Sequence, residues 1–168
     1  TAESHHRVFL VEVMGRHSGA IAMAVGVAGG AEAIVTPEWP TDVPALATHL
    51  IAEWAKRTSS VVVVSEGDDH GGAAALAKAL LPHMPGADMR VTVLGHVQRG
   101  GAPSPRDRIL AARLGADVAS GLLAGERGFM SGIWKGDLRR IPMAEVASGN
   151  QEPAVRLADL ARALSRLC

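Results

Sequence analysis

The chain has 168 residues, of which 48% are hydrophobic, and its 17 basic and 17 acidic residues give a formal net charge of zero. That length fits one large domain, and the hydrophobic fraction is sufficient for a buried core. Zero net charge and an aromatic content of 3% argue against nucleic acid as a partner, because such proteins carry basic patches or aromatic stacking platforms. The one cysteine, Cys168, excludes an internal disulfide framework and a cysteine zinc cluster.

No long uncharged apolar run and no signal peptide are visible in the sequence. We therefore expect a cytoplasmic protein with no membrane partner.

Strands and helices are expected to alternate along the chain. Short β-rich runs predict strands at residues 8–13, 33–36, 60–65 and 91–94. Helical spacing predicts helices at residues 18–28, from Asp42 onward, at 73–84 and at 105–123. One or two short strands are expected within 129–142, and a last helix after Pro153. This alternation predicts an α/β fold with a mostly parallel sheet layered with helices.

Polar and glycine-rich segments follow three of the predicted strands. They are Met14-Gly15-Arg16, then Glu66, then the segment from Gly95 to Arg99. Ligands of parallel sheets bind at the carboxyl ends of the strands, so these segments predict a binding site there.

Four arginines flank predicted strand ends: Arg7, Arg16, Arg90 and Arg99. A guanidinium group binds phosphate oxygens in pairs, and a carboxylate such as that of Glu66 accepts hydrogen bonds from hydroxyl groups. A cluster of these residues fits a phosphorylated sugar. Any one of them taken singly is more often a surface ion-pair partner or a solvated loop residue. Because several occur together at strand ends, the residues alone leave the two interpretations balanced.

Asp68, Asp69 and His70 are adjacent, carry ligating atoms and precede two glycines. Adjacent residues rarely converge on one ion, so we expect a turn and a helix start here and no metal site. Arg106 and Arg108 open a predicted helix and are interpreted as structural or surface residues.

Four segments in order resemble the bacterial 6-phosphofructokinases. They are SHHR (4–7), VEVMGRHSG (11–19), AGGAE (28–32) and LGHVQRGGAPSPRDR (94–108). The resemblance covers nearly the whole chain and corresponds to the second half of the family's chain only. It implies a phosphofructokinase-like α/β fold, second half only. It also implies a sugar-phosphate domain at 1–97, a segment crossing to the nucleotide domain at 98–150, and a returning helix at 151–168.

The resemblance assigns a set of sugar-phosphate contacts, namely Arg7, Met14, Gly15, Arg16, Glu66, Arg90, His96, Val97, Gln98 and Arg99. In this family the arginines matching Arg7 and Arg90 reach a neighbouring subunit's site and hold the 6-phosphate, which implies a homotetramer with shared sites. Arg16 would also stabilise the transferring group.

No other catalytic residue is expected, because the general base belongs to the first half. Gly30, Ala31 and Glu32 match an effector-binding segment, whose later basic cluster is here reduced to Lys56-Arg57.

The resemblance implies part of a glycolytic 6-phosphofructokinase, which transfers a phosphoryl group from ATP to the 1-hydroxyl of fructose 6-phosphate and yields fructose 1,6-bisphosphate. ATP and Mg²⁺ would be bound mainly by the first half, so this segment alone is expected to be inactive and to expose apolar surface. Two alternatives stay open: a pyrophosphate-dependent phosphofructokinase, and a non-catalytic sugar-phosphate-binding or regulatory module. An unrelated phosphate-transferring enzyme would need its own base and nucleotide loop, and neither is visible.

Overall fold

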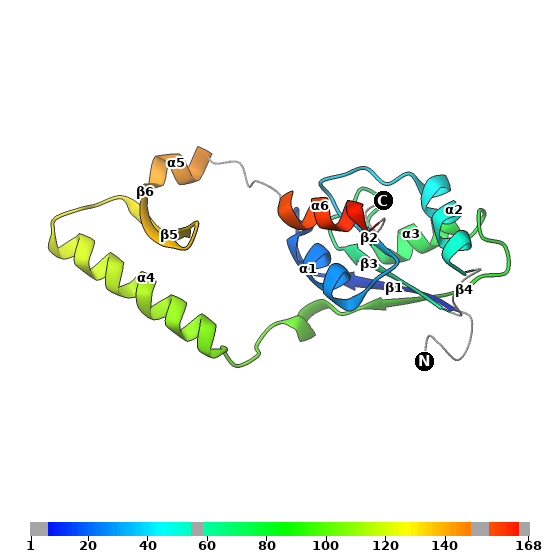
Figure 1. Cartoon of the computed structure of the whole chain (residues 1–168), viewed down its shortest axis with the longest axis horizontal. Coiled ribbons are helices and arrows are strands. Elements are labelled where there is room, and N and C mark those ends of the chain that lie inside the picture. The colour runs from blue at the N-terminus through cyan, green and yellow to red at the C-terminus, as the bar shows by residue number, and fades with distance from the viewer. Residues whose placement is uncertain (1–6, 55–58, 149–154, 165–168) are drawn as a thin grey trace. The chain divides into compact units, whose positions relative to one another are not determined.

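The computed structural model describes residues 7–54, 59–148 and 155–164, which belong to two compact units (Figure 1). Unit 1 comprises Thr1–Arg99 and Glu152–Cys168, and unit 2 comprises Gly100–Gln151. The expected boundaries after residues 97 and 150 lie beside these divisions, and the assignment of unit 2 to a nucleotide-binding domain stays a prediction. None of the helices in the described ranges combines the length and the apolar character needed to cross a bilayer.

Unit 1 is built on a four-stranded sheet in the order β2-β3-β1-β4. Its strands are β1 (Arg7–Val13), β2 (Ala33–Val35), β3 (Ser60–Ser65) and β4 (Asp88–Val93). Every neighbouring pair is parallel. Three of the four valines of β3, an inner strand of the sheet, are buried and Val61 is partly buried, as expected of a strand covered on both faces. The expected α/β class with a mostly parallel sheet is confirmed.

Helices cover both faces of this sheet. They are α1 (Ala20–Gly29), α2 (Val43–Trp54), α3 (Ala73–Leu80) and α6 (Val155–Ala163). Successive side chains of a strand point to opposite faces, so the sheet feeds two separate cores. One core packs the sheet against α2 and α3, and the other packs it against α1 and α6.

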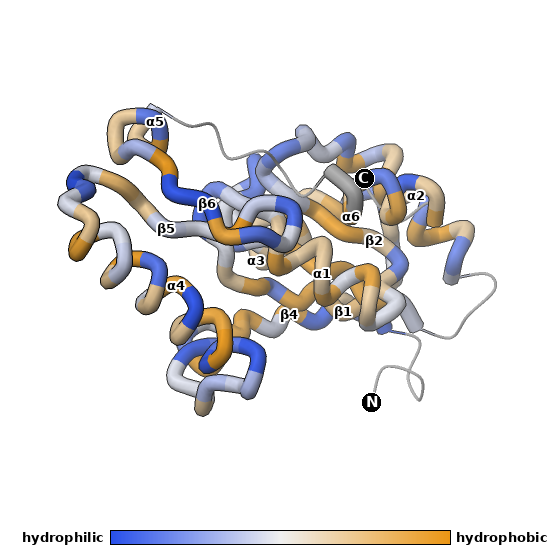
Figure 2. Tube along the Cα trace, turned by 60° about the vertical axis from the view of Figure 1, so that its left-hand side comes forward, coloured by the Kyte–Doolittle hydropathy of each residue, from blue (hydrophilic) through white to orange (hydrophobic). Residues whose placement is uncertain are grey.

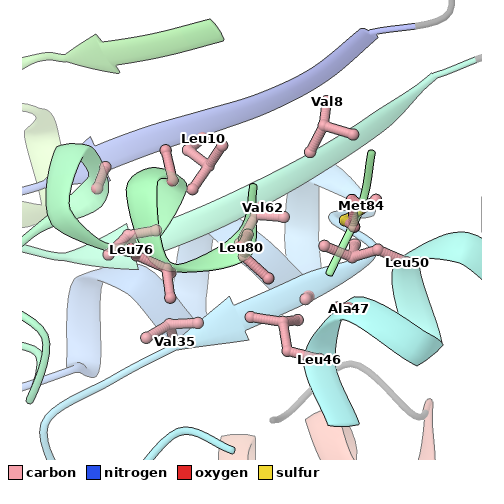
Figure 3. Close-up of a cluster of buried hydrophobic side chains, with 14 residues drawn as sticks. Val8, Leu10, Val35, Leu46, Ala47, Leu50, Val62, Leu76, Leu80 and Met84 are labelled. Carbon is pink, nitrogen blue, oxygen red and sulfur yellow. The ribbon is translucent and has the colours of Figure 1, made fainter. Parts of the chain in front are cut away.

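The core under α2 and α3 is made of aliphatic side chains (Figure 3). Leu46 and Leu50 come from α2, and Leu76 and Leu80 come from α3. All four are fully buried, and each such leucine contributes about 1.5–3 kcal/mol of transfer free energy. This core fixes the sheet whose strand ends are described below.

Two helices of unit 1 depart from the expected pattern. Helix α3 ends at Leu80, although the apolar spacing extends to Met84, which is nevertheless buried in the same core. Helix α2 begins after Asp42, whose Oδ1 accepts a hydrogen bond from the Ala45 amide at 3.0 Å, as expected of a capping residue. Its residue Ile51, which helical spacing places on the apolar face with Leu46 and Leu50, is 46% exposed.

Helix α1 is hydrophobic along most of its length, whereas hydrophobic and hydrophilic residues alternate along α4 (Pro105–Leu123) of unit 2 (Figure 2). Helix α1 ends where Gly30 adopts a left-handed conformation with φ of 72°. Gly26 faces Ile34 of β2, and a Cβ added there would lie 2.6 Å from that side chain. The glycine therefore lets α1 approach the sheet closely.

Unit 2 contains α4, an antiparallel hairpin of β5 (Phe129–Trp134) and β6 (Asp137–Pro142), and the short helix α5 (Met143–Ser148). Helix α4 has the predicted bounds, the hairpin falls in the predicted range, and α5 was not predicted.

Gly121 is the only buried residue among those described in this unit. A hollow of about 560 Å³ is lined by Arg106, Ile109, Leu110, Arg113, Ile133 and Gly136. Unit 2 thus exposes apolar surface, as expected.

Candidate functional site

Three loops meet at the carboxyl edge of the sheet in unit 1. Strand β1 lies between β3 and β4, so the segments that follow these three strands are neighbours. They are Met14–Gly19 after β1, Glu66–Gly72 after β3, and the 3₁₀ turn Gly95–Gln98 (η1) after β4. The three polar segments singled out in the sequence therefore come together in one place.

Glu66 ties the first two segments together. Its Oε1 accepts hydrogen bonds from the backbone amides of Arg16 at 2.7 Å and Gly15 at 3.2 Å. These two bonds hold the pKa of Glu66 below its ordinary value, and the positive charges of Arg99 and Arg16 lower the pKa further. Glu66 is therefore ionised at neutral pH beside two guanidinium groups, and its Oε2 lies outside these two bonds.

The backbone after β1 adopts a restricted conformation. Arg16 has a φ of 51°, a left-handed value that costs about 1–2 kcal/mol for a non-glycine residue. A Cβ on Gly15 would lie 2.2 Å from the Ser18 carbonyl oxygen, and a Cβ on Gly67 would lie 1.6 Å from the Arg16 carbonyl oxygen. Both glycines are required by close backbone approach, and Gly67 makes room for the strained residue.

The turn after β4 is joined to the same loop. Gln98 accepts a hydrogen bond from the Met14 amide at 3.4 Å through Oε1 and donates to the Gly95 carbonyl at 3.2 Å through Nε2. The Arg99 amide donates to the His96 carbonyl at 3.0 Å. His96 and Arg99 are exposed, as is Val97, at 81%. The turn presents cationic and polar side chains to solvent beside Glu66.

Arg7 and Arg90 lie at the opposite edge of the sheet. Arg7 opens β1, and Arg90 pairs with Phe9, near the start of both strands. Because a strand rises about 3.3 Å per residue, the seven residues of β1 separate its two ends by about 20 Å. Within one chain the four arginines therefore form two groups, with Arg16 and Arg99 near Glu66 and Arg7 and Arg90 toward the other end of the strands. The expectation that Arg7 and Arg90 act in a neighbouring subunit's site stays a prediction.

Asp88 forms ion pairs with both Arg7 and Arg90. Its Oδ2 accepts a hydrogen bond from Arg7 Nε at 2.6 Å and another from Arg90 Nη2 at 3.2 Å. The bond from Arg7 is the main cause that lowers the pKa of Asp88 below its ordinary value. Asp88 was not singled out in the sequence, because it is one acidic residue between Ala87 and Met89 at the start of a strand and belongs to no motif.

The segment assigned to effector binding lies between α1 and β2. Gly30 ends α1, and the buried Ala31 donates its amide to the Gly26 carbonyl. Glu32 Oε2 accepts a hydrogen bond from the Val61 amide at 2.6 Å. Lys56-Arg57, the reduced basic cluster, lies outside the described residues.

Asp68, Asp69 and His70 lie close enough together to hold a metal ion. Their carboxylates are already engaged, since Asp68 accepts hydrogen bonds from the Gly72 and His70 amides and Asp69 accepts one from the Thr41 amide. They shape the turn before α3, as expected.

Two residues that shape the loops around this site, Glu12 and Gly67, were missed in the sequence. Glu12 Oε2 accepts a hydrogen bond from the Ala73 amide at 2.8 Å, which caps the start of α3. An acidic residue inside an apolar strand was the signal that could have revealed it. Gly67 gave no such signal, because its role depends on where Arg16 lies in space.

Residues 1–122 match the protein family described as Phosphofructokinase. The chain belongs to the phosphofructokinase family. The resemblance inferred from the motifs is confirmed, and the site above is the carboxyl edge of a phosphofructokinase sheet.

Individual relatives agree with this assignment. ATP-dependent 6-phosphofructokinase 1 of Thermus thermophilus is 49% identical over 168 residues, which cover 99% of this chain and 50% of the relative. The pyrophosphate-dependent phosphofructokinase of Marinobacter aquaeolei superimposes with a TM-score of 0.80 at 27% identity, over 92% of this chain and 43% of that one. Phosphofructokinase of Saccharomyces cerevisiae gives a TM-score of 0.77 at 32% identity, over 97% and 22%. The chain spans about half the length of the curated relative it matches.

Proposed function

We propose that this chain is the sugar-phosphate-binding part of a glycolytic 6-phosphofructokinase. The reaction transfers a phosphoryl group to the 1-hydroxyl of fructose 6-phosphate and gives fructose 1,6-bisphosphate. The observation that carries the proposal is that the loops bearing Arg16, Glu66 and Arg99 meet at the carboxyl ends of neighbouring strands, where Glu66 accepts hydrogen bonds from the Arg16 and Gly15 amides. The guanidinium groups suit the anionic phosphate of a phosphorylated sugar, and the carboxylate suits its hydroxyl groups.

In this proposal different residues contact different chemical groups of the substrate. Glu66 accepts hydrogen bonds from sugar hydroxyls through the oxygen that the loop does not use. Met14, Gly15, His96, Val97, Gln98 and Arg99 surround the sugar phosphate. Arg16 faces the transferring group and stabilises the charge that develops on it. Positioning and charge stabilisation supply most of the catalysis of phosphoryl transfer.

ATP is the proposed phosphoryl donor. The relative that is 49% identical is named an ATP-dependent enzyme, whereas the structural neighbour named pyrophosphate-dependent is 27% identical. The higher identity favours ATP, and pyrophosphate is the alternative donor.

ATP and Mg²⁺ are proposed to bind mainly to the part of the relatives that this chain does not span. Among the described residues, the one candidate metal group is Asp68, Asp69 and His70. It does not suit Mg²⁺, which prefers oxygen ligands, because one member is a histidine and the carboxylates already accept backbone hydrogen bonds. No residue of this chain is assigned to the metal or to proton abstraction.

Assembly is proposed from the position of Arg7 and Arg90. These residues lie too far from Glu66 to touch the same sugar phosphate in one chain, so we place them in the site of a neighbouring copy, around the 6-phosphate. We further propose that the assembly is a homotetramer with shared sites and that it acts in the cytoplasm. An effector site at Gly30, Ala31 and Glu32 completes the proposal of an allosteric enzyme.

A non-catalytic module that only binds sugar phosphates is the second candidate. It is favoured by the absence of an assigned general base among the described residues.

The test is phosphorylation of fructose 6-phosphate by the intact protein, with ATP and then pyrophosphate as donor. Unphosphorylated fructose is the matched acceptor control. We expect fructose 1,6-bisphosphate to form from ATP and the phosphorylated acceptor only. Binding of fructose 6-phosphate without turnover by either donor would support the module instead.

A further inference from the structure

A second charged group lies at the amino edge of the sheet in unit 1. Asp88 opens β4 and is the register partner of Arg7, the first residue of β1. Arg7 Nε donates to Asp88 Oδ2 at 2.6 Å, Arg90 Nη2 donates to the same oxygen at 3.2 Å, and Arg90 Nε lies 3.0 Å from Oδ1. One carboxylate therefore joins two guanidinium groups from neighbouring strands.

We propose that Asp88 is a positioning residue, which holds Arg7 and Arg90 together as one clamp for a phosphate monoester. This inference rests on the proposed function, which places both arginines on the 6-phosphate. A guanidinium group has five N–H donors. Asp88 engages Nε of Arg7 and both Nε and Nη2 of Arg90, which leaves the Nη1 donors of both arginines outside these contacts and available to a second anion. The group carries two positive charges and one negative charge, so an anion is still attracted.

The exposure of the three side chains explains why positioning matters. The side chain of Arg7 is 24% exposed, that of Asp88 is 41% exposed and that of Arg90 is 55% exposed. Without Asp88, two like charges would face each other on flexible side chains, and binding would have to order both of them. With Asp88, that ordering is completed before the ligand arrives.

Charge alone predicts the opposite effect of Asp88. Its negative charge repels an incoming phosphate, so a purely electrostatic role predicts that removing the charge strengthens binding. A positioning role predicts weaker binding after Asp88→Asn, and also after Asp88→Glu, which keeps the charge but changes the length of the side chain. The two variants therefore separate the roles.

The experiment is calorimetric titration of the intact protein with fructose 6-phosphate and with fructose. The variants are Asp88→Asn and Asp88→Glu, and Asp137→Asn is a control at an exposed acid of unit 2. We expect about 10-fold weaker binding of fructose 6-phosphate by both Asp88 variants, since two long side chains must then be ordered. Binding by Asp137→Asn should be unchanged. In turnover, the KM for the sugar phosphate should rise while kcat stays the same.

Equal or tighter binding by Asp88→Asn would overturn the positioning role and leave the proposed function intact. A wild-type protein that does not distinguish fructose 6-phosphate from fructose would overturn the proposed function instead. Nitrogen-15 NMR of the arginine Nε–H groups then tests Asp88 without any ligand. Slow hydrogen exchange at Arg7 and Arg90 that is lost in Asp88→Asn supports the clamp, and unchanged exchange contradicts it.

Discussion

At the residue scale, Glu66 and Gly67 act together on the loop after β1. Glu66 draws the amides of Gly15 and Arg16 toward it, and Gly67 leaves room for the Arg16 carbonyl. The left-handed conformation of Arg16 is held between these two contacts, which explains how a strained residue persists at a site.

Replacing Gly67 with alanine should therefore displace the Arg16 carbonyl. The added Cβ would lie 1.6 Å from that backbone oxygen, so the loop must move. We expect a loss of about 1–3 kcal/mol in the free energy of unfolding, measured by urea denaturation, together with weaker binding of fructose 6-phosphate. Gly29→Ala is the matched control, because nothing lies within 4 Å of its Cβ position. Equal stability of the two variants would contradict this role of Gly67.

The lowered pKa of Glu66 links the same loop to pH. A carboxylate whose pKa is lower in the folded state stabilises the fold above its unfolded pKa, which is about 4.3 for a glutamate, and loses that contribution as the pH falls through the folded value. We expect the wild type to be more stable than Glu66→Gln at about pH 7, and this difference to shrink steadily as the pH is lowered into the acid range below the unfolded pKa. Unfolding free energies across this pH range provide the test, and a difference that grows in acid would refute the assignment.

At the element scale, the sequence predicted the secondary structure best where local signals agree. The bounds of α4 were predicted from leucine spacing and Pro105, and the structure adds a reciprocal cap between Ser104 and Asp107. Helix α3 was predicted too long. The apolar spacing continues to Met84, and Met84 is buried in the core, but the residues between Leu80 and Met84 form turns. Helix α5 was missed, since its six residues are too few for a periodic pattern.

The cap of α4 can be tested directly. Ser104 Oγ accepts a hydrogen bond from the Asp107 amide at 3.3 Å, and Asp107 Oδ2 accepts one from the Ser104 amide at 2.8 Å. Ser104→Ala should lower the free energy of unfolding by about 1 kcal/mol. Ser120→Ala, near the end of the same helix, should leave it nearly unchanged. Thermal denaturation of both variants checks this, and equal melting temperatures would argue against the cap.

At the scale of the whole molecule, the sequence predicted that the segments after three strands lie together, and the structure confirms that arrangement. The motifs identified Arg16, Glu66 and Arg99, because each follows a strand, and the parallel sheet brings strand ends together. The separation of Arg7 and Arg90 from them follows from strand direction, and Asp88 became visible only through the register of β1 and β4.

The sequence says least about what packs against the apolar side chains of unit 2. Its described residues expose large apolar side chains, among them Ile109 at 62% and Leu123 at 90%. A unit with so little buried surface gains little stability from its own packing. Unit 2 therefore presents apolar surface that its own residues leave uncovered.

The central claim is that the carboxyl edge of the unit 1 sheet binds the phosphorylated sugar. Steady-state kinetics of Arg99→Ala in the intact protein test it most directly, with fructose 6-phosphate and ATP varied in turn. Loss of one charged hydrogen-bond partner costs about 1.5–3 kcal/mol, so kcat/KM for fructose 6-phosphate should fall roughly 10- to 150-fold while the KM for ATP changes little. Unchanged kinetics for the sugar phosphate, or an equal loss for both substrates, would contradict the claim.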